Sequence, residues 1–115
     1  KNILVWQKAH ELVKLIYETT SLFPSHELYG ITSQLRRAVV SIPANIAEGA
    51  GKGTNADFCR FLQIAFGSAC EVEYLLFLSF ELNYLSKETY DKSSARLTEI
   101  KRMLSGLMKK LKTVN

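Results

Sequence analysis

The sequence has 115 residues and a formal charge of +4, with 47% hydrophobic and 23% charged residues. This composition excludes a disordered chain, and the length suits one globular domain, residues 1–115, but not two. Glycine and proline are sparse, at 6 and 2 residues, which favours long helices over a β architecture with many turns.

An amphipathic pattern predicts a first helix from about residue 3 to 22. Its apolar stripe consists of Val5, Ala9, Leu12, Val13, Ile16, Tyr17 and Thr20. Pro24 ends this helix, because the residue before a proline is pushed out of the α region. Ser25 or Thr32 is expected to cap the next helix. The start of the chain runs directly into this charged helical pattern, which is unlike a secretory signal peptide.

A second helix is predicted up to about Ala50, and it has two stripes. The apolar stripe is Leu35, Ala38, Val39, Ile42 and Ile46, and the polar stripe beside it is Gln34, Arg37, Ser41, Asn45 and Glu48. The polar stripe is either an internal seam of hydrogen-bonding groups or an ordinary solvated surface. Both stripes continue in phase through Pro43, so we expect one kinked helix rather than two. The glycines that follow it predict a turn, not a phosphate-binding loop.

The pattern Thr54-Asn55-Ala56-Asp57 resembles a capping box and opens a third helix. The second half of this helix is apolar nearly all round, so either it is central or, as we favour, its outer face meets another subunit. Charged residues interrupt the apolar run, which argues against a membrane span. Across the bundle, one polar network is expected to join Arg37, Ser41, Asn45, Glu48, Ser68 and Glu71.

The two cysteines, Cys59 and Cys70, fall eleven residues apart in the third helix. That spacing corresponds to about 16 Å along a helix axis, which is too far for a disulfide bond. Both are expected to be small buried residues, as is usual in a reducing compartment, and we therefore expect a cytoplasmic protein.

A fourth helix is predicted from about residue 87 to 112, with an inner seam of leucine and isoleucine at coiled-coil spacing. From Lys92 onwards there are seven basic residues and one acid, Glu99, whereas the preceding chain has a net charge of −2. The basic residues expected to bind nucleic acid are Arg96, Lys101, Arg102, Lys109, Lys110 and Lys112. Four helices with short connections predict an all-α, antiparallel up-down-up-down bundle.

No catalytic, cofactor-binding or metal-ligating set is recognisable in the sequence. His10 and His26 are the two histidines, and neither lies in the spacing of a zinc or di-iron bundle. Glu48 and Glu71 would make a paired-carboxylate site only if Arg37 did not neutralise them in a structural network. The sequence therefore predicts a protein that is not an enzyme.

Several segments resemble the four-helix-bundle proteins encoded by intervening sequences in bacterial 23S rRNA genes. They are Val5-Trp6-Gln7-Lys8-Ala9, Phe23-Pro24, Glu27-Leu28-Tyr29-Gly30, residues 34–49, Phe61-Leu62 and Gly67-Ser68-Ala69-Cys70-Glu71. The resemblance covers nearly the whole chain, and residues 41–49 are its most specific part. It implies a homopentameric ring of antiparallel bundles, and it implies no defined biochemical activity.

A more distant resemblance, to the accessory bundle of diversity-generating retroelements, implies nucleic-acid binding by a basic pentamer. Five copies of this chain would carry a formal charge of +20, which suits non-specific binding of RNA or DNA by counterion release. Two alternatives remain open at this stage. In the first, the basic face is only solvated and binds nothing. In the second, the oligomer is a scaffold for a partner protein and has no role with nucleic acid. No membrane partner is expected in either case.

Overall fold

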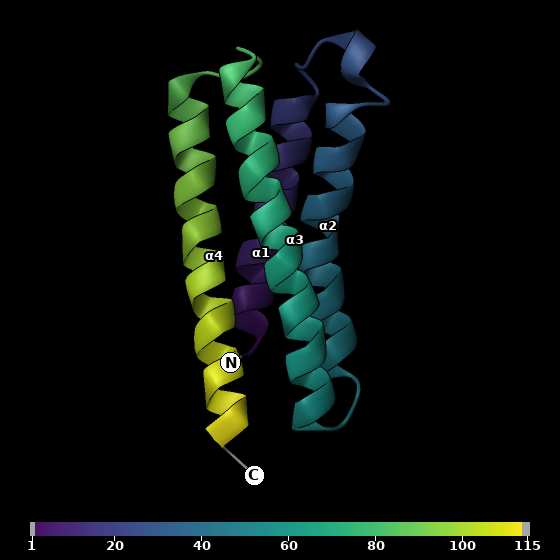
Figure 1. Cartoon of the computed structure of the whole chain (residues 1–115), viewed down its shortest axis with the longest axis vertical. Coiled ribbons are helices and arrows are strands. Elements are labelled where there is room, and N and C mark those ends of the chain that lie inside the picture. The colour runs from purple at the N-terminus through teal and green to yellow at the C-terminus, as the bar shows by residue number, and fades with distance from the viewer. Residues whose placement is uncertain (1, 114–115) are drawn as a thin grey trace.

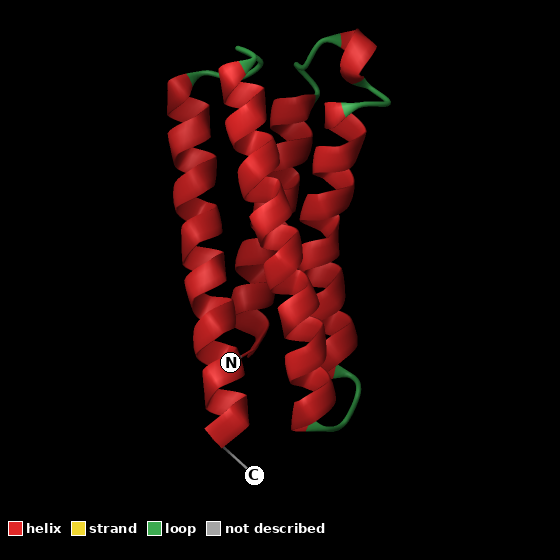
Figure 2. Ribbon diagram, in the orientation of Figure 1, coloured by secondary structure: helices red, strands yellow, loops and turns green. Residues whose placement is uncertain are grey.

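The structure is a computed structural model that describes residues 2–113, with side chains described from Leu4 onwards. The chain forms four long helices and one short 3-10 turn: α1 (Asn2–Thr20), η1 (Ser25–Glu27), α2 (Ile31–Ala50), α3 (Asn55–Glu81) and α4 (Lys87–Thr113). Successive helices run side by side in alternating directions, and η1 lies beyond the ends of α1 and α2 (Figures 1 and 2). Each helix packs against the next, and α4 packs against α1. The predicted all-α four-helix bundle is therefore confirmed.

One apolar core runs along the bundle, which measures 48 × 24 × 18 Å. Each helix contributes residues at spacings of three and four, so that they form one stripe. Fully buried large side chains are Leu12, Ile16, Leu35, Ile42, Ile46, Leu62, Leu76, Leu97, Ile100 and Leu104. Burying each of these contributes about 1.5–3 kcal/mol to folding. The outward-facing residues are thus left to decide what the protein contacts.

The link between α1 and α2 differs from the sequence prediction. Helix α1 ends at Thr20. The N-cap residue of α2 is Gly30, which has no side chain to form a capping hydrogen bond. Thr32 lies buried inside α2 rather than at its end, so the predicted capping by Ser25 or Thr32 is wrong. The N–H of Ile31, in the first turn of α2, instead donates to Glu27 Oε1 at 3.2 Å.

Helix α2 is continuous through Pro43, as its uninterrupted stripes predict. The accompanying kink stays a prediction. Near its C-terminal end α2 approaches α3 closely at Gly49, which is buried. A Cβ atom added to Gly49 would lie 2.6 Å from Phe61 Cβ and 3.1 Å from Phe58 Cδ1. Helices can approach this closely only where one of them lacks a side chain.

Helix α3 begins as predicted, because the Thr54 hydroxyl accepts a hydrogen bond from the Asp57 N–H at 3.1 Å. Among the described residues α3 is the single helix long and apolar enough to cross a membrane by those two criteria. The core helix of a soluble protein passes the same test, so the expectation that α3 does not span a membrane stays a prediction. Its buried side chains pack against α2 and α4 in the bundle core, but only 33% of its most apolar segment is buried, so the core accounts for only part of the apolar composition.

The two cysteines differ in their surroundings. Cys59 is buried, and its thiol contacts the Met108 carbonyl oxygen at 3.7 Å. Cys70 is exposed, so the prediction that both cysteines are buried was wrong for this residue. Both thiols are free, because residues eleven apart on one helix cannot be joined by a disulfide.

Helix α4 completes the bundle and carries most of the basic residues. Its first turn is capped by Ser86, since the Thr89 N–H donates to Ser86 Oγ at 3.1 Å. Ser93, Leu97, Ile100 and Leu104 form its buried seam, whereas Leu107 is half-buried. The C-terminal end of α4 lies at the same end of the bundle as the α2–α3 connection (Figure 1).

Candidate functional site

The six basic residues of α4 expected to bind nucleic acid fall into three sets in the structure. Lys101 is held by α3, because its ammonium group donates to Glu73 Oε1 at 2.8 Å. This hydrogen bond raises the pKa of Lys101, so the group stays charged. Its charge is nevertheless locally compensated, which makes Lys101 a weaker attraction for a polyanion than an unpaired lysine.

Arg96 lies on the opposite side of α4, towards α1. It lines a surface hollow of about 410 Å³ together with Lys8, Glu11 and Glu99. Lys8 and Glu99 form an ion pair of 3.4 Å across the two helices. The two carboxylates make this hollow nearly neutral, so it is poorly suited to an anion.

The remaining four residues are exposed in the C-terminal half of α4: Arg102, Lys109, Lys110 and Lys112. None of them forms an ion pair with another described residue. Elsewhere in the described chain, cations commonly have an acidic neighbour, as in Lys52–Glu48 at 3.9 Å and Lys87–Asp91 at 2.7 Å. Arg36, Arg37 and Lys92 also form no ion pair within the described chain, but they are dispersed over α2 and the start of α4, whereas Lys109, Lys110 and Lys112 are grouped in the last turns of α4.

Two joined surface hollows lie between this end of α4 and the start of α3. The first, of about 450 Å³, is lined by Gln63, Phe66, Ser105, Met108, Lys109 and Lys112. The second, of about 470 Å³, adds Arg60 and Leu111 and shares Gln63 and Lys112 with the first. We call the pair the α3–α4 groove. The sequence pattern does not mark Gln63 or Phe66 as site residues, because nothing close to them in the chain shows that α4 lies beside them.

Three members of the predicted polar network are joined in the structure. The Ser41 and Ser68 hydroxyls share a hydrogen bond of 2.8 Å between α2 and α3. The Asn45 amide donates to the Ser41 carbonyl oxygen at 2.8 Å and to Ser41 Oγ at 2.9 Å. All three residues are partly buried. The polar stripe of α2 is therefore a seam at the α2–α3 contact only in its middle part.

The charged members of that network lie outside the seam. Arg37 and Glu71 are exposed and line a hollow of about 250 Å³ beside Ser41 and Ser68. Neither forms an ion pair within the described chain, and Glu48 lies 3.9 Å from Lys52. Exposed ion pairs contribute only ~0–1 kcal/mol. Within the described subunit, the charged residues Arg37, Glu48 and Glu71 thus do not form hydrogen bonds or ion pairs with one another as the predicted network requires.

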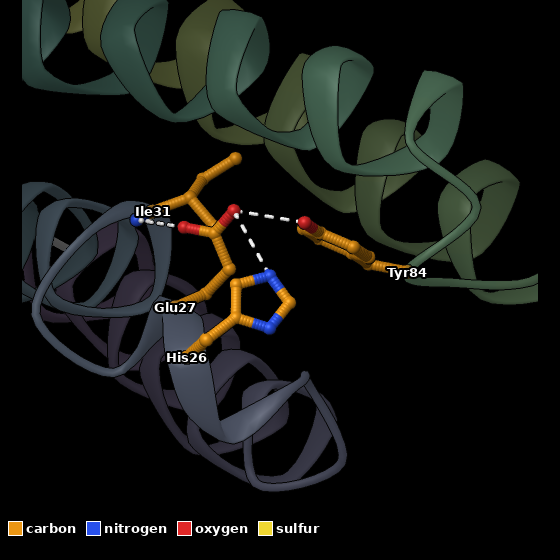
Figure 3. A network of polar contacts seen from close by, with 4 residues as sticks. All are labelled: His26, Glu27, Ile31 and Tyr84. Carbon is orange, nitrogen blue, oxygen red and sulfur yellow. Dashed lines mark hydrogen bonds and ion pairs between the residues drawn. The ribbon is translucent and has the colours of Figure 1, made fainter.

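A different polar cluster, absent from the sequence prediction, closes the other end of the bundle (Figure 3). The Glu27 carboxylate accepts hydrogen bonds from the Tyr84 hydroxyl at 2.8 Å and from the Ile31 N–H at 3.2 Å. His26 Nε2 lies 4.0 Å from the same carboxylate. These contacts tie η1 to the α3–α4 connection. The Tyr84 hydrogen bond is the main cause of a lowered pKa for Glu27, and it also raises the pKa of Tyr84.

The Tyr84→Phe substitution is expected to raise the pKa of Glu27 towards its ordinary value of 4.5. A lowered carboxyl pKa stabilises the fold above the unfolded-state value, and this stability is lost as pH falls through the folded-state value. Tyr84→Phe should therefore be less stable than the wild type above about pH 4.5 and nearly equal well below it. Carboxyl NMR titration of Glu27 measures the shift. Tyr29→Phe, which alters a side chain that is 93% exposed, is the control; identical Glu27 titrations in the wild type and Tyr84→Phe would contradict the expectation.

Within residues 2–113, no three His, Cys, Asp or Glu side chains lie close enough together to hold a metal ion. His10 is exposed, and its ring stacks on Trp6 with a centroid separation of 5.1 Å. Glu48 and Glu71, the carboxylates considered as a pair, have different neighbours, namely Lys52 and the hollow beside Arg37.

Comparison with known proteins agrees with the fold and the sequence motifs. The family described as 23S rRNA-intervening sequence protein matches residues 1–106. The crystal structure of a protein of unknown function from the S23 ribosomal protein family of Bacteroides thetaiotaomicron VPI-5482 is similar, with 29% identity and a TM-score of 0.87. That match covers 94% of this chain and 97% of the other. The search of curated proteins finds no match. The chain therefore belongs to the 23S rRNA-intervening sequence protein family.

Proposed function

We propose that this protein is a non-enzymatic, homo-oligomeric bundle that binds RNA or DNA non-specifically through the phosphate backbone. The observation that carries the proposal is the set of four exposed, unpaired cations in the C-terminal half of α4: Arg102, Lys109, Lys110 and Lys112. Arg96 and Lys101 contribute less, because carboxylates compensate them. We assign the protein to the cytoplasm, where its free cysteines would stay reduced.

Phosphate binding by such a group has a simple physical basis. Each lysine or arginine that contacts a phosphate releases condensed counterions, and the gain falls steeply as salt increases. Contacts of this kind carry no sequence information. Binding is therefore expected to be similar for different sequences and sensitive to salt.

Self-association would multiply these contacts, and the outer faces of α2 and α3 support it. The exposed residues of α2 at spacings of three and four are Val40, Ala44 and Ala47, with Arg37 as their charged neighbour. On α3, Ile64 is 44%, Phe77 47% and Tyr74 60% exposed. Such a sparsely charged surface is typical of a subunit contact. Arg37 and Glu71 lie in one hollow on this surface, and each could pair with the opposite charge on a second copy.

Light scattering tests the oligomer, for which we propose five subunits. The protein is expected to scatter as a multiple of its 13.0 kDa chain mass at micromolar concentration. Replacing the exposed aromatic Tyr74 by glutamate should shift the assembly towards the monomer, whereas Tyr29→Glu, at the distant α1–α2 connection, should not. A wild-type monomer would refute self-association and, with it, the multiplied charge.

A binding titration tests the nucleic-acid proposal. Labelled RNA and DNA of several sequences should bind the wild type at 50 mM salt and dissociate at 200 mM, with a linear dependence of log K on log salt. Absence of binding at low salt would overturn the proposal. The protein would then be a scaffold for a partner protein, with affinity for that partner that changes little with salt.

A further inference from the structure

The α3–α4 groove differs from the rest of the surface in both charge and shape. Three basic residues line it, Arg60, Lys109 and Lys112, and no acid is among the described residues that line either hollow. Asp57 lies 3.7 Å from Arg60 and compensates it in part. Lys109 and Lys112 have no such partner in the described chain. An anion entering the groove would therefore meet mainly these two lysines.

The lining of the groove also includes apolar side chains, among them a half-buried aromatic ring. Phe66 is half-buried and lines the first hollow beside Met108. Lys101 Nζ lies 5.6 Å from the centroid of its ring. Gln63, at the junction of the two hollows, and Ser105 offer hydrogen-bonding groups. A planar, uncharged ligand ring could stack on Phe66, and polar atoms at its edge could form hydrogen bonds with Gln63 or Ser105.

We propose that the α3–α4 groove binds single-stranded RNA or DNA, with phosphates at Lys109 and Lys112 and an unpaired base against Phe66. The inference rests on the proposed nucleic-acid binding and specifies where and in which form the strand is held. Proteins that bind single strands without sequence preference combine a basic groove with aromatic side chains on which bases stack. Each hollow, at about 450–470 Å³, lies within the roughly 300–1,000 Å³ of small-ligand pockets.

A duplex would not use the groove in the same way. Its bases are stacked and paired inside the helix, so that only its phosphates reach the lysines. The distinction separates the groove from simple charge attraction. The Phe66 ring and the Gln63 amide should matter for a single strand, while the lysines should matter for both forms.

The test is a fluorescence anisotropy titration with a labelled 12-nucleotide poly-U RNA, the matching poly-dT DNA and a 12-base-pair duplex. Phe66→Leu should weaken binding of both single strands by about 5- to 150-fold, the usual effect of losing one base–aromatic contact. Gln63→Glu, at an exposed position, places an acid at the junction and should weaken single-strand binding by at least about tenfold, with a smaller effect on the duplex. Phe80→Leu alters another half-buried phenylalanine of α3, which stacks on Tyr90 outside the groove, and should change nothing.

The outcomes separate this inference from the proposal beneath it. If Lys109→Gln and Lys112→Gln weaken binding while Phe66→Leu and Gln63→Glu leave the single strands unaffected, the groove inference is overturned and backbone binding stands. If no oligonucleotide binds the wild type, both fall. If a poly-glutamate peptide binds the wild type more tightly than the single strands do, the groove is a site for an acidic protein segment and the inference fails. Thermal unfolding of Phe66→Leu checks that the bundle is intact, and Gln63→Glu gives an answer independent of the core.

Discussion

Changing Lys109, Lys110 and Lys112 to glutamate is expected to weaken the binding of RNA and DNA by roughly 500-fold or more at 0.1 M salt. Three phosphate contacts account for about 2.7 of the slope of log K against log salt, which corresponds to a factor of about 10^2.7 between 0.1 M and 1 M salt. The variant should bind every sequence more weakly and with a flatter slope. Titrations at four salt concentrations measure both quantities.

A variant with the same net charge is the control for this result. Lys14, Lys87 and Lys92 are exposed and lie away from the C-terminal end of α4; changing all three to glutamate alters the formal charge of the chain equally. This control should keep most of the affinity, because the proposed contacts are local. Equal losses in both variants would mean that net charge alone attracts the polyanion.

The glutamates also stand near a helix C-terminus, where the helix dipole disfavours acids by about 0.3–1 kcal/mol each. Circular dichroism should confirm that the bundle remains folded. The corresponding triple glutamine variant removes the charge without this penalty. It should lose affinity in the same direction, and wild-type affinity in it would contradict a role for the three lysines.

Gly49→Ala is expected to destabilise the bundle by about 1–3 kcal/mol, although alanine is the better helix former. The added methyl would lie 2.6 Å from Phe61 Cβ and 3.1 Å from a ring carbon of Phe58. A Cβ atom is fixed to its backbone and cannot swing aside, so α2 and α3 must separate locally. Overpacking of this kind outweighs the gain of ~1 kcal/mol from replacing a helical glycine.

Gly106→Ala is the matched control. No atom lies within 4 Å of a Cβ built at Gly106, which is exposed in α4. This variant should be more stable than the wild type by about 0.5–1 kcal/mol. Urea unfolding of the two variants should therefore give changes of opposite sign. If Gly49→Ala is more stable than the wild type, α2 and α3 can separate at Phe61 with little loss of stability, and the expectation is wrong.

The helices and most of their ends could be predicted from residues close together in the chain. Helix α2 runs through Pro43 because its apolar stripe stays in phase, and the caps at Thr54 and Ser86 act within three residues. The α1–α2 connection could not be predicted in this way. There the Glu27 carboxylate accepts a hydrogen bond from the first turn of α2 and another from the Tyr84 hydroxyl, which is 57 positions away in the chain. No local pattern marks such a pair.

The candidate site shows the same division. The sequence correctly indicates that α4 carries excess positive charge, because counting charges needs no partner. It does not indicate that Glu73 of α3 forms an ion pair with Lys101. Nor does it indicate that Arg96 shares a hollow with Glu11 of α1 and Glu99 of α4. These pairings depend on which helix lies on each side of α4.

The polar stripe of α2 makes the reason clear. Successive helix residues are rotated by about 100°, so periodicity assigns Arg37, Ser41 and Asn45 to one side of α2. The angle at which α3 meets that side decides how far burial extends across it. Ser41 meets Ser68 at 2.8 Å, while Arg37 remains exposed at the margin. Apolar periodicity thus determines which stripe of each helix faces inward, whereas grooves and cross-helix pairs arise from two surfaces and require the packed bundle.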